Sequence, residues 1–271
     1  MWTIPSQAAD QVLNETAIGH GMLLGMAALP TAYTEWAAPA ALRPAVVCLW
    51  AQTATQDRET LVLPDACTDL IWEQGRGVFL AGPDTAAVPA RMEPGTAIVG
   101  VRFPPGAGGA VLGVPLSEVR DQRVDLADLR PAEARRADLS ADLDPETAAA
   151  RLLDLAGALV TGSTPDPDVA HAASLLRDPQ LRVEDAAAEV GLSMRQLRRR
   201  CDAGVGYGPK TLQRILRFRR FVSWIDAGQV TDLAAVAVAA GYADQAHLTR
   251  ECVRMSGFTP VSLMGVRRNA S

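Results

Sequence analysis

Hydrophobic residues near the C-terminal end of the chain recur at a spacing of three and four residues. Over residues 183–190 they fall at positions i, i+3, i+4 and i+7, which is one face of a short helix, and Gly191 is expected to end it. A second helix is predicted after a brief turn, over residues 194–202. Residues 232–240 and 244–254 repeat the arrangement. The pattern predicts two units, each made of a helix, a tight turn and a helix.

The two units share identical residues at a fixed offset of 51 positions. The matching pairs are Leu197 and Leu248, Arg199 and Arg250, Cys201 and Cys252, Gly206 and Gly257, and Pro209 and Pro260. Five identities at one offset in so short a window indicate a duplicated supersecondary unit.

The second helix of a helix-turn-helix unit is the one offered to the major groove of DNA. With Leu197 and Cys201 facing the core, a step of 100° per residue turns the polar residues outward. The candidate DNA-contacting residues are Arg195, Gln196, Arg198 and Arg199 in the first unit and Gln245, His247, Thr249 and Arg250 in the second. Arginine bonds guanine and neutralises phosphate, whereas a run of arginines on one helix is also typical of a solvated surface.

Residues 211–225, between the units, carry an apolar stripe at helical spacing with arginines on the other side. They predict a linking helix. A stiff helix here would hold the units at a fixed distance, as needed to reach successive major grooves about 34 Å apart. Together with the duplication, this favours DNA binding over the solvated-surface alternative.

Residues 181–264 resemble the double helix-turn-helix domain of the AraC/XylS family of transcriptional regulators. The match is carried by residues 183–191, by the run GYADQAHLTRECVRMSGFTP over 241–260, and by the sequence Phe-Arg-Arg at 218–220. The resemblance implies base or phosphate contacts for Arg195, Arg198 and Arg199 and for Gln245, His247 and Arg250. Two departures are Cys201 and Cys252, where the family usually has a larger apolar residue, and the glycine-rich residues 203–207, which together predict a less rigid first unit.

Charge is divided unevenly along the chain. Residues 167–271 hold 15 Lys and Arg against 10 Asp and Glu, and residues 1–166 hold 11 against 21, which gives about +5 and about −10. The overall charge of −5 therefore hides a basic C-terminal segment, as expected for a nucleic-acid-binding domain.

The N-terminal half contains short runs rich in Val, Ile, Leu and aromatic residues, separated by Pro, Gly and Asp. The runs cover residues 46–50, 59–63, 70–73, 78–81 and 97–103. Strands at this spacing favour a sandwich or a barrel. The predicted fold class is therefore α+β, with an N-terminal β-rich barrel or sandwich followed by an all-α double helix-turn-helix domain.

Residues 33–129 resemble the N-terminal domain of a subset of actinobacterial AraC-like regulators. The landmarks are LPDACTDLIW at 63–72, AGPDT at 81–85 and GVRFPPG at 100–106. The resemblance implies a degenerate cupin that senses a small molecule or mediates dimerisation. The predicted organisation is an N-terminal extension over 1–32, a β-rich sensor or regulatory domain over 33–130, a helical connector and linker over 131–167, and the DNA-binding domain over 168–271.

Trp50, Trp72 and Arg102 are the candidate ligand-binding residues, with the aromatics stacking on an organic ligand and Arg102 anchoring an acidic group. The alternative is that the aromatics fill the core and that Arg102 is a structural ion-pair partner. Cupin enzymes hold a metal with clustered histidines, and the N-terminal half has only His20. No metal, no cofactor and no catalytic residue is therefore expected. Cys67, beside two carboxylates, is expected to be unreactive.

The chain lacks a run of about 18 uncharged apolar residues and a basic signal-peptide start, so we expect a cytoplasmic protein with no membrane partner. Its four cysteines, widely spaced, are expected to be reduced core thiols.

The sequence thus predicts a sequence-specific transcriptional regulator that is not an enzyme. The expected partners are double-stranded promoter or operator DNA, a small-molecule effector, RNA polymerase and a second copy of the chain. Two alternatives remain: a DNA-binding regulator whose N-terminal half is structural and insensitive to ligand, and an enzyme with an accessory helix-turn-helix module. The enzyme alternative needs a catalytic cluster in residues 1–160, where no Ser-His-Asp, metal or phosphate-loop pattern occurs.

Overall fold

A computed structural model describes residues 29–268 of the chain. Most of the predicted extension over residues 1–32 lies outside the described residues, and His20 lies outside them too. None of the described helices is both long and apolar enough to cross a lipid bilayer.

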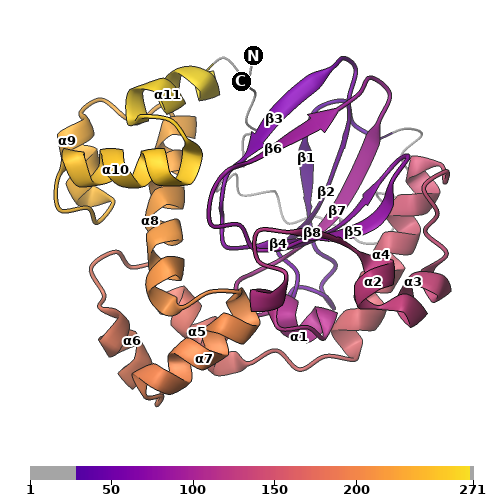
Figure 1. The fold of residues 1–271 in the computed structure, drawn as a ribbon, viewed down its shortest axis with the longest axis horizontal. Helices are drawn as coiled ribbons and strands as arrows, with labels where there is room; N and C mark the ends of the chain where they lie inside the picture. The colour runs from indigo at the N-terminus through magenta and orange to yellow at the C-terminus, as the bar shows by residue number, and fades with distance from the viewer. Residues whose placement is uncertain (1–28, 269–271) are drawn as a thin grey trace.

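The N-terminal half is built on two antiparallel sheets (Figure 1). The larger has six strands in the order β1-β2-β7-β4-β5-β8, and the smaller pairs β3 with β6. The strands are β1 (Thr34–Ala37), β2 (Cys48–Thr53), β3 (Arg58–Val62), β4 (Thr68–Glu73), β5 (Gly77–Ala81), β6 (Val88–Met92), β7 (Ala97–Phe103) and β8 (Arg123–Asp125).

Successive side chains of a strand point to opposite sides of its sheet. In the larger sheet, apolar side chains occupy both sides. One face packs against helix α4 (Pro145–Thr161) and holds the main N-terminal core, which includes Leu70, Trp72 and Phe103. The other face carries a much smaller cluster built around Trp50 and other residues of β2, β4 and β5. The second face is therefore only partly filled by the protein's own side chains.

The fold class α+β is confirmed, and of the two N-terminal alternatives the structure has the sandwich, since the sheets do not close into a barrel. All five predicted strands are present. The strands missed by the sequence pattern are short or irregular: β1 and β8 have four and three residues, and β6 contains Pro89. Proline in a strand is confined to edges, and β6 is an edge of the two-stranded sheet.

Short helices complete the N-terminal half: α1 (Gly108–Leu112), a single 3₁₀ turn η1 (Leu116–Glu118), α2 (Leu126–Leu129) and α3 (Pro131–Ala137). The connector helix α4 starts at a defined cap, because the Asp144 carboxylate accepts a hydrogen bond from the Thr147 amide at 2.8 Å. It packs in the N-terminal core, whereas the helix that follows it packs in the C-terminal core.

The C-terminal part is entirely helical. Its helices are α5 (Pro167–Leu175), α6 (Val183–Glu189), α7 (Met194–Val205), α8 (Pro209–Asp226), α9 (Leu233–Ala239), α10 (Gln245–Ser256) and α11 (Pro260–Arg268). Helices α6 and α7 form the first helix-turn-helix unit and α9 and α10 form the second. Helix α8 joins them, with one unit at each of its ends (Figure 1).

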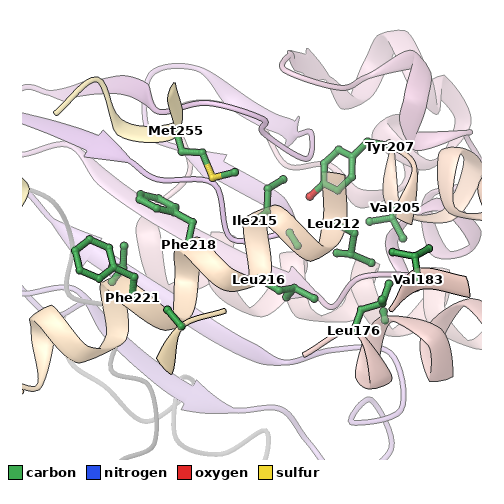
Figure 2. Packing of buried hydrophobic residues seen from close by; sticks show 14 of the residues in the cluster. Leu176, Val183, Val205, Tyr207, Leu212, Ile215, Leu216, Phe218, Phe221 and Met255 are labelled. Carbon is green, nitrogen blue, oxygen red and sulfur yellow. The ribbon is translucent and has the colours of Figure 1, made fainter. Parts of the chain in front are cut away.

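The apolar stripe of α8 is the spine of the C-terminal core. Figure 2 shows the buried side chains of α8 in a row. Leu176, just after α5, and Val183, at the start of α6, lie near Leu212, and Met255 of α10 lies near Phe218. Phe218 has no exposed surface. One continuous core therefore includes both units, so each is packed against the same helix.

Two glycine-rich segments bring the N- and C-terminal halves into close contact. A Cβ added at Gly109 in α1 would lie 2.7 Å from the Ala203 carbonyl oxygen, and one at Gly206 would lie 2.4 Å from the ring of Pro83. Gly206 also has a φ of 93°, which disfavours other residues. The glycine-rich end of α7, which the sequence linked to a less rigid first unit, thus serves a tight contact between the halves.

All four cysteines are buried and unpaired. Burial raises the pKa of the Cys48 and Cys201 thiols to about 12 and that of Cys252 to about 11. Burial also raises the pKa of Cys67, and the neighbouring Asp65 carboxylate adds to this effect. For Cys67, burial contributes more to the raised pKa than the neighbouring carboxylates do.

These thiols are expected to resist alkylation while the chain is folded, because at pH 8 a thiol with a pKa of about 11 is only about one-thousandth ionised. Iodoacetamide labelling followed by mass spectrometry should find almost no modification of the native protein and four modified cysteines in denaturant. Rapid labelling of the native chain would show that at least one thiol is accessible and ionised.

Candidate nucleic-acid interface

Both candidate recognition helices, α7 and α10, begin at a side-chain cap. In α7 the Gln196 backbone amide donates to Ser193 Oγ at 3.3 Å, and the Ser193 amide donates to Gln196 Oε1 at 2.9 Å. In α10 the His247 amide donates to Asp244 Oδ1 at 2.6 Å. These caps satisfy amide groups that would otherwise lack partners and fix where each helix starts.

The outward face of α7 is basic and accessible. Leu197 and Cys201 are fully buried, while Arg195, Arg198 and Arg199 are exposed. Among residues 29–268, no carboxylate forms an ion pair with Arg195 or Arg199, and Arg198 has only a 3.9 Å contact with Asp202. The predicted arginine face is therefore available to a ligand.

Two other residues of α7 are already engaged within the protein. The side chain of Gln196 completes the helix cap with Ser193, so its carbonyl oxygen is occupied. Arg200 lies beside the predicted face and pairs with Asp166 and Asp168, at 3.2 and 2.8 Å. It joins α7 to the start of α5 instead of projecting outward.

The outward face of α10 carries fewer charges. Gln245 and Arg250 are exposed, and no described carboxylate forms an ion pair with Arg250. His247 is half-buried and its Nδ1 accepts a hydrogen bond from the Ala243 amide at 3.3 Å. Thr249 is also half-buried, and its hydroxyl donates to the Gln245 carbonyl oxygen at 2.9 Å.

The arginines of α8, which the sequence placed on its polar side, hold neighbouring segments in position. Arg214 pairs with Glu251 of α10, with 2.7 Å between Nε and Oε2. Arg217 and Arg220 donate to the carbonyl oxygens of Pro179 and Arg177, in the loop between α5 and α6. Glu251 was not singled out from the sequence. The signal was available, because a carboxylate on the buried side of a helix requires a positively charged partner.

Helix α8 has 18 residues and is therefore about 27 Å long. The first unit directly precedes the N-terminal end of α8, whereas α10 packs along α8 through Met255, near Phe218, and through the ion pair between Arg214 and Glu251.

A cavity of about 480 Å³ lies between the two sheets of the N-terminal half, and α8 and α11 each contribute one residue to its wall, Val222 and Arg267. Trp50 and Arg102, two of the three candidate ligand-binding residues, line it. Trp72 does not line it. It lies on the opposite face of the larger sheet, fully buried against α4, and its indole NH donates to the Ser140 carbonyl oxygen at 2.9 Å.

Arg102 is buried and surrounded by acidic groups. Its Nε is 3.1 Å from Asp69 Oδ1, its Nη1 is 3.1 Å from Glu35 Oε1, and Asp65 lies at 3.8 Å. Burial raises the pKa of Asp69, an effect that Arg102 opposes. This is the structural ion pair that the sequence left open as the alternative to an anchor for an acidic ligand.

The sequence of the chain matches two known domain families. Residues 34–125 match a family described as a domain of unknown function (DUF6597), and residues 186–264 match a helix-turn-helix domain family. Comparison with curated protein sequences gave no match.

Among solved structures, the chain is similar to ToxT from Vibrio cholerae. ToxT of strain O395 is 10% identical, over 80% of this chain and 96% of that chain, with a TM-score of 0.43. Wild-type ToxT of strain SCE256 bound to an unsaturated fatty acid is 11% identical, over 89% and 94%, with a TM-score of 0.39.

Proposed function

We propose that the chain is a DNA-binding transcriptional regulator of the AraC/XylS type, which its helix-turn-helix match over residues 186–264 supports, and that α7 and α10 enter two successive major grooves on one side of the duplex. The observation that carries this proposal is that each helix is capped and presents an exposed arginine with no ion-pair partner among the described residues. Arg195, Arg198 and Arg199 of α7, and Gln245 and Arg250 of α10, are the proposed contacts. Gln196, His247 and Thr249 contribute less, since each already makes a hydrogen bond within its own unit.

The first unit is proposed to supply most of the electrostatic attraction. Three exposed arginines on α7 neutralise more phosphate charge than Arg250 does on the outward face of α10.

Replacing Arg199 with alanine is expected to weaken binding to the preferred site by about 1–3 kcal/mol and to relax the preference at one base position. Gel retardation with duplexes selected from a random pool measures both effects. Arg136→Ala is the matched control, because it removes the same charge from an exposed helix of the N-terminal half. A loss that is equal for all sequences would reassign Arg199 to a phosphate contact.

The role of the second unit is tested by replacing Arg250. Arg250→Ala should shrink the protected region of the site on the side of α10 while leaving protection by α7 in place. An unchanged footprint would mean that only the first unit engages DNA.

We further propose that the N-terminal half senses a small molecule. The support is the cavity between its sheets, since Val222 and Arg267 from the DNA-binding half complete the wall. A bound ligand contacts both halves and therefore favours arrangements in which both sets of contacts are made.

A route from this cavity to the second unit is present in the backbone. The Ala87 amide, next to β6, donates to the Met255 carbonyl oxygen of α10 at 2.7 Å. Because β6 forms one wall of the cavity, a shift of this strand on ligand binding displaces the end of α10.

A further inference from the structure

The cavity between the sheets has two apolar walls that face each other. The larger sheet contributes Trp50, Ile71, Phe79 and Ile98, and the smaller sheet contributes Val62, Val88 and Met92. A Cβ at Gly100 would lie 2.2 Å from the Trp50 ring, so the indole lies directly over the backbone of β7. Two facing sheets with a flat aromatic floor form a slot that fits a flat, apolar molecule.

The arginines that line this cavity are all paired with carboxylates. The pairs are Arg76 with Asp125, Arg91 with Asp57, Arg102 with Asp69 and Glu35, Arg123 with Asp84, and Arg267 with Asp226. An acidic ligand would have to displace one of these carboxylates and leave it without a counter-charge, which is costly where the pair is buried. The pairs of Arg102, Arg123 and Arg267 are mostly buried, whereas those of Arg76 and Arg91 are exposed, so beside the first three arginines the cavity is suited to a neutral molecule.

One buried polar group at the cavity lacks a hydrogen-bond partner. Gln52 lies on β2 two residues from Trp50, on the same face of the sheet, and only 5% of its surface is exposed. Its Nε2 forms no hydrogen bond with any described residue. Leaving a buried donor without an acceptor is unfavourable, and a ligand oxygen that accepts its hydrogen bond removes that cost.

We propose that this cavity binds a neutral, flat, largely apolar molecule that carries a hydrogen-bond acceptor, and that the side-chain amide of Gln52 donates to the acceptor. The proposal rests on the ligand-sensing part of the proposed function and specifies the chemistry of the ligand. Trp50 stacks on the ring system, and Val222 and Arg267 place the ligand in contact with α8 and α11.

Three related probes test the proposal on the full chain. Xanthone is a flat neutral ketone, xanthene is the same ring system without the carbonyl group, and xanthone-2-carboxylate adds a negative charge. A ligand that binds only the folded state raises the melting temperature, and tryptophan fluorescence titration gives its Kd. Xanthone is expected to raise the melting temperature and to bind at least about tenfold more tightly than either of the other two.

Gln52→Leu keeps the side-chain size and removes the donor. It is expected to weaken xanthone binding at least about tenfold and to leave xanthene binding unchanged. The melting temperature of the unliganded variant should stay the same or rise, because the variant loses an unsatisfied buried donor. Gln229→Leu, at an exposed position that does not line the cavity, is the control and should bind xanthone as the unmodified chain does.

Three results would overturn the proposal: no thermal shift with xanthone, tighter binding of the carboxylate than of xanthone, or equal loss of xanthone and xanthene binding in Gln52→Leu. Gel retardation of DNA by the same preparation is measured in parallel. A failed ligand test with intact DNA retardation removes only the ligand chemistry, whereas failure of DNA retardation removes the proposed function itself.

Discussion

Phe218→Ala is expected to lower the free energy of unfolding of the chain by about 3–5 kcal/mol, because it opens a cavity at the centre of the C-terminal core. Phe218 lies in the middle of α8, has no exposed surface, and is part of the core that both helix-turn-helix units share. The surrounding side chains of Ile215, Phe221 and Met255 fill the space that it leaves only in part (Figure 2).

Urea unfolding followed by circular dichroism at about 222 nm measures this loss. Val261→Ala is the control, because Val261 is an apolar residue of α11 with 67% of its surface exposed, and its replacement should change stability by less than about 0.5 kcal/mol. Equal stability changes in the two variants would mean that α8 is not the centre of a shared core.

Arg214→Ala is expected to lower the free energy of unfolding by about 3 kcal/mol, because it leaves the Glu251 carboxylate without its main partner. Glu251 is nearly buried, with 11% of its side chain exposed, and Arg214 bonds both of its oxygens, at 2.7 and 3.1 Å. Removing one partner of a buried ion pair is strongly destabilising. We expect a loss at the low end of the usual range, because a third of the Arg214 side chain is exposed. The second unit should also lose its fixed orientation on α8.

Arg254→Ala supplies a matched control for the same carboxylate. Arg254 lies 3.9 Å from Glu251 and is 66% exposed, so its removal should cost less than about 1 kcal/mol. Thermal unfolding and DNA retardation of both variants measure the two effects. A loss for Arg254→Ala as large as that for Arg214→Ala would show that the Arg214 contact has no special role.

The helical half of the fold was predictable because its signals are local. An apolar face at a spacing of three and four residues, a glycine at the end of α6 and capping residues at Ser193 and Asp244 each depend on residues within one turn. Duplication of the unit strengthened each signal. The positions of Leu197 and Leu248 in the core, and of Arg199 and Arg250 outside it, follow from this periodicity.

The cavity between the sheets was less predictable because both faces of the larger sheet are apolar. Trp50 pairs with Gly100, and Ile71 pairs with Gly100 from the other side, so Trp50 and Ile71 share a face while Trp72 points the opposite way. Strand register sets this outcome, and a shift of one residue would reverse it. The sequence alone therefore did not separate the cavity residue Trp50 from the core residue Trp72.

Partners of the arginines were also hidden from sequence reasoning, since they come from distant segments. Arg200 pairs with Asp168, 32 positions away, and Arg219 donates to the Asp65 carbonyl oxygen of the N-terminal half. Residue type and spacing placed both on polar faces, but only the tertiary arrangement shows that they hold segments together.

In the proposed mode of DNA binding, α8 holds two recognition helices so that they enter successive major grooves on one side of the duplex. Methylation-protection footprinting at guanine N7, on a duplex selected from a random pool, tests it most directly because N7 lies in the major groove. We predict two protected windows centred about 10 base pairs apart on the same side of the duplex, with the second window lost in Arg250→Ala. A single window in the unmodified chain, or two windows on opposite sides, would contradict it.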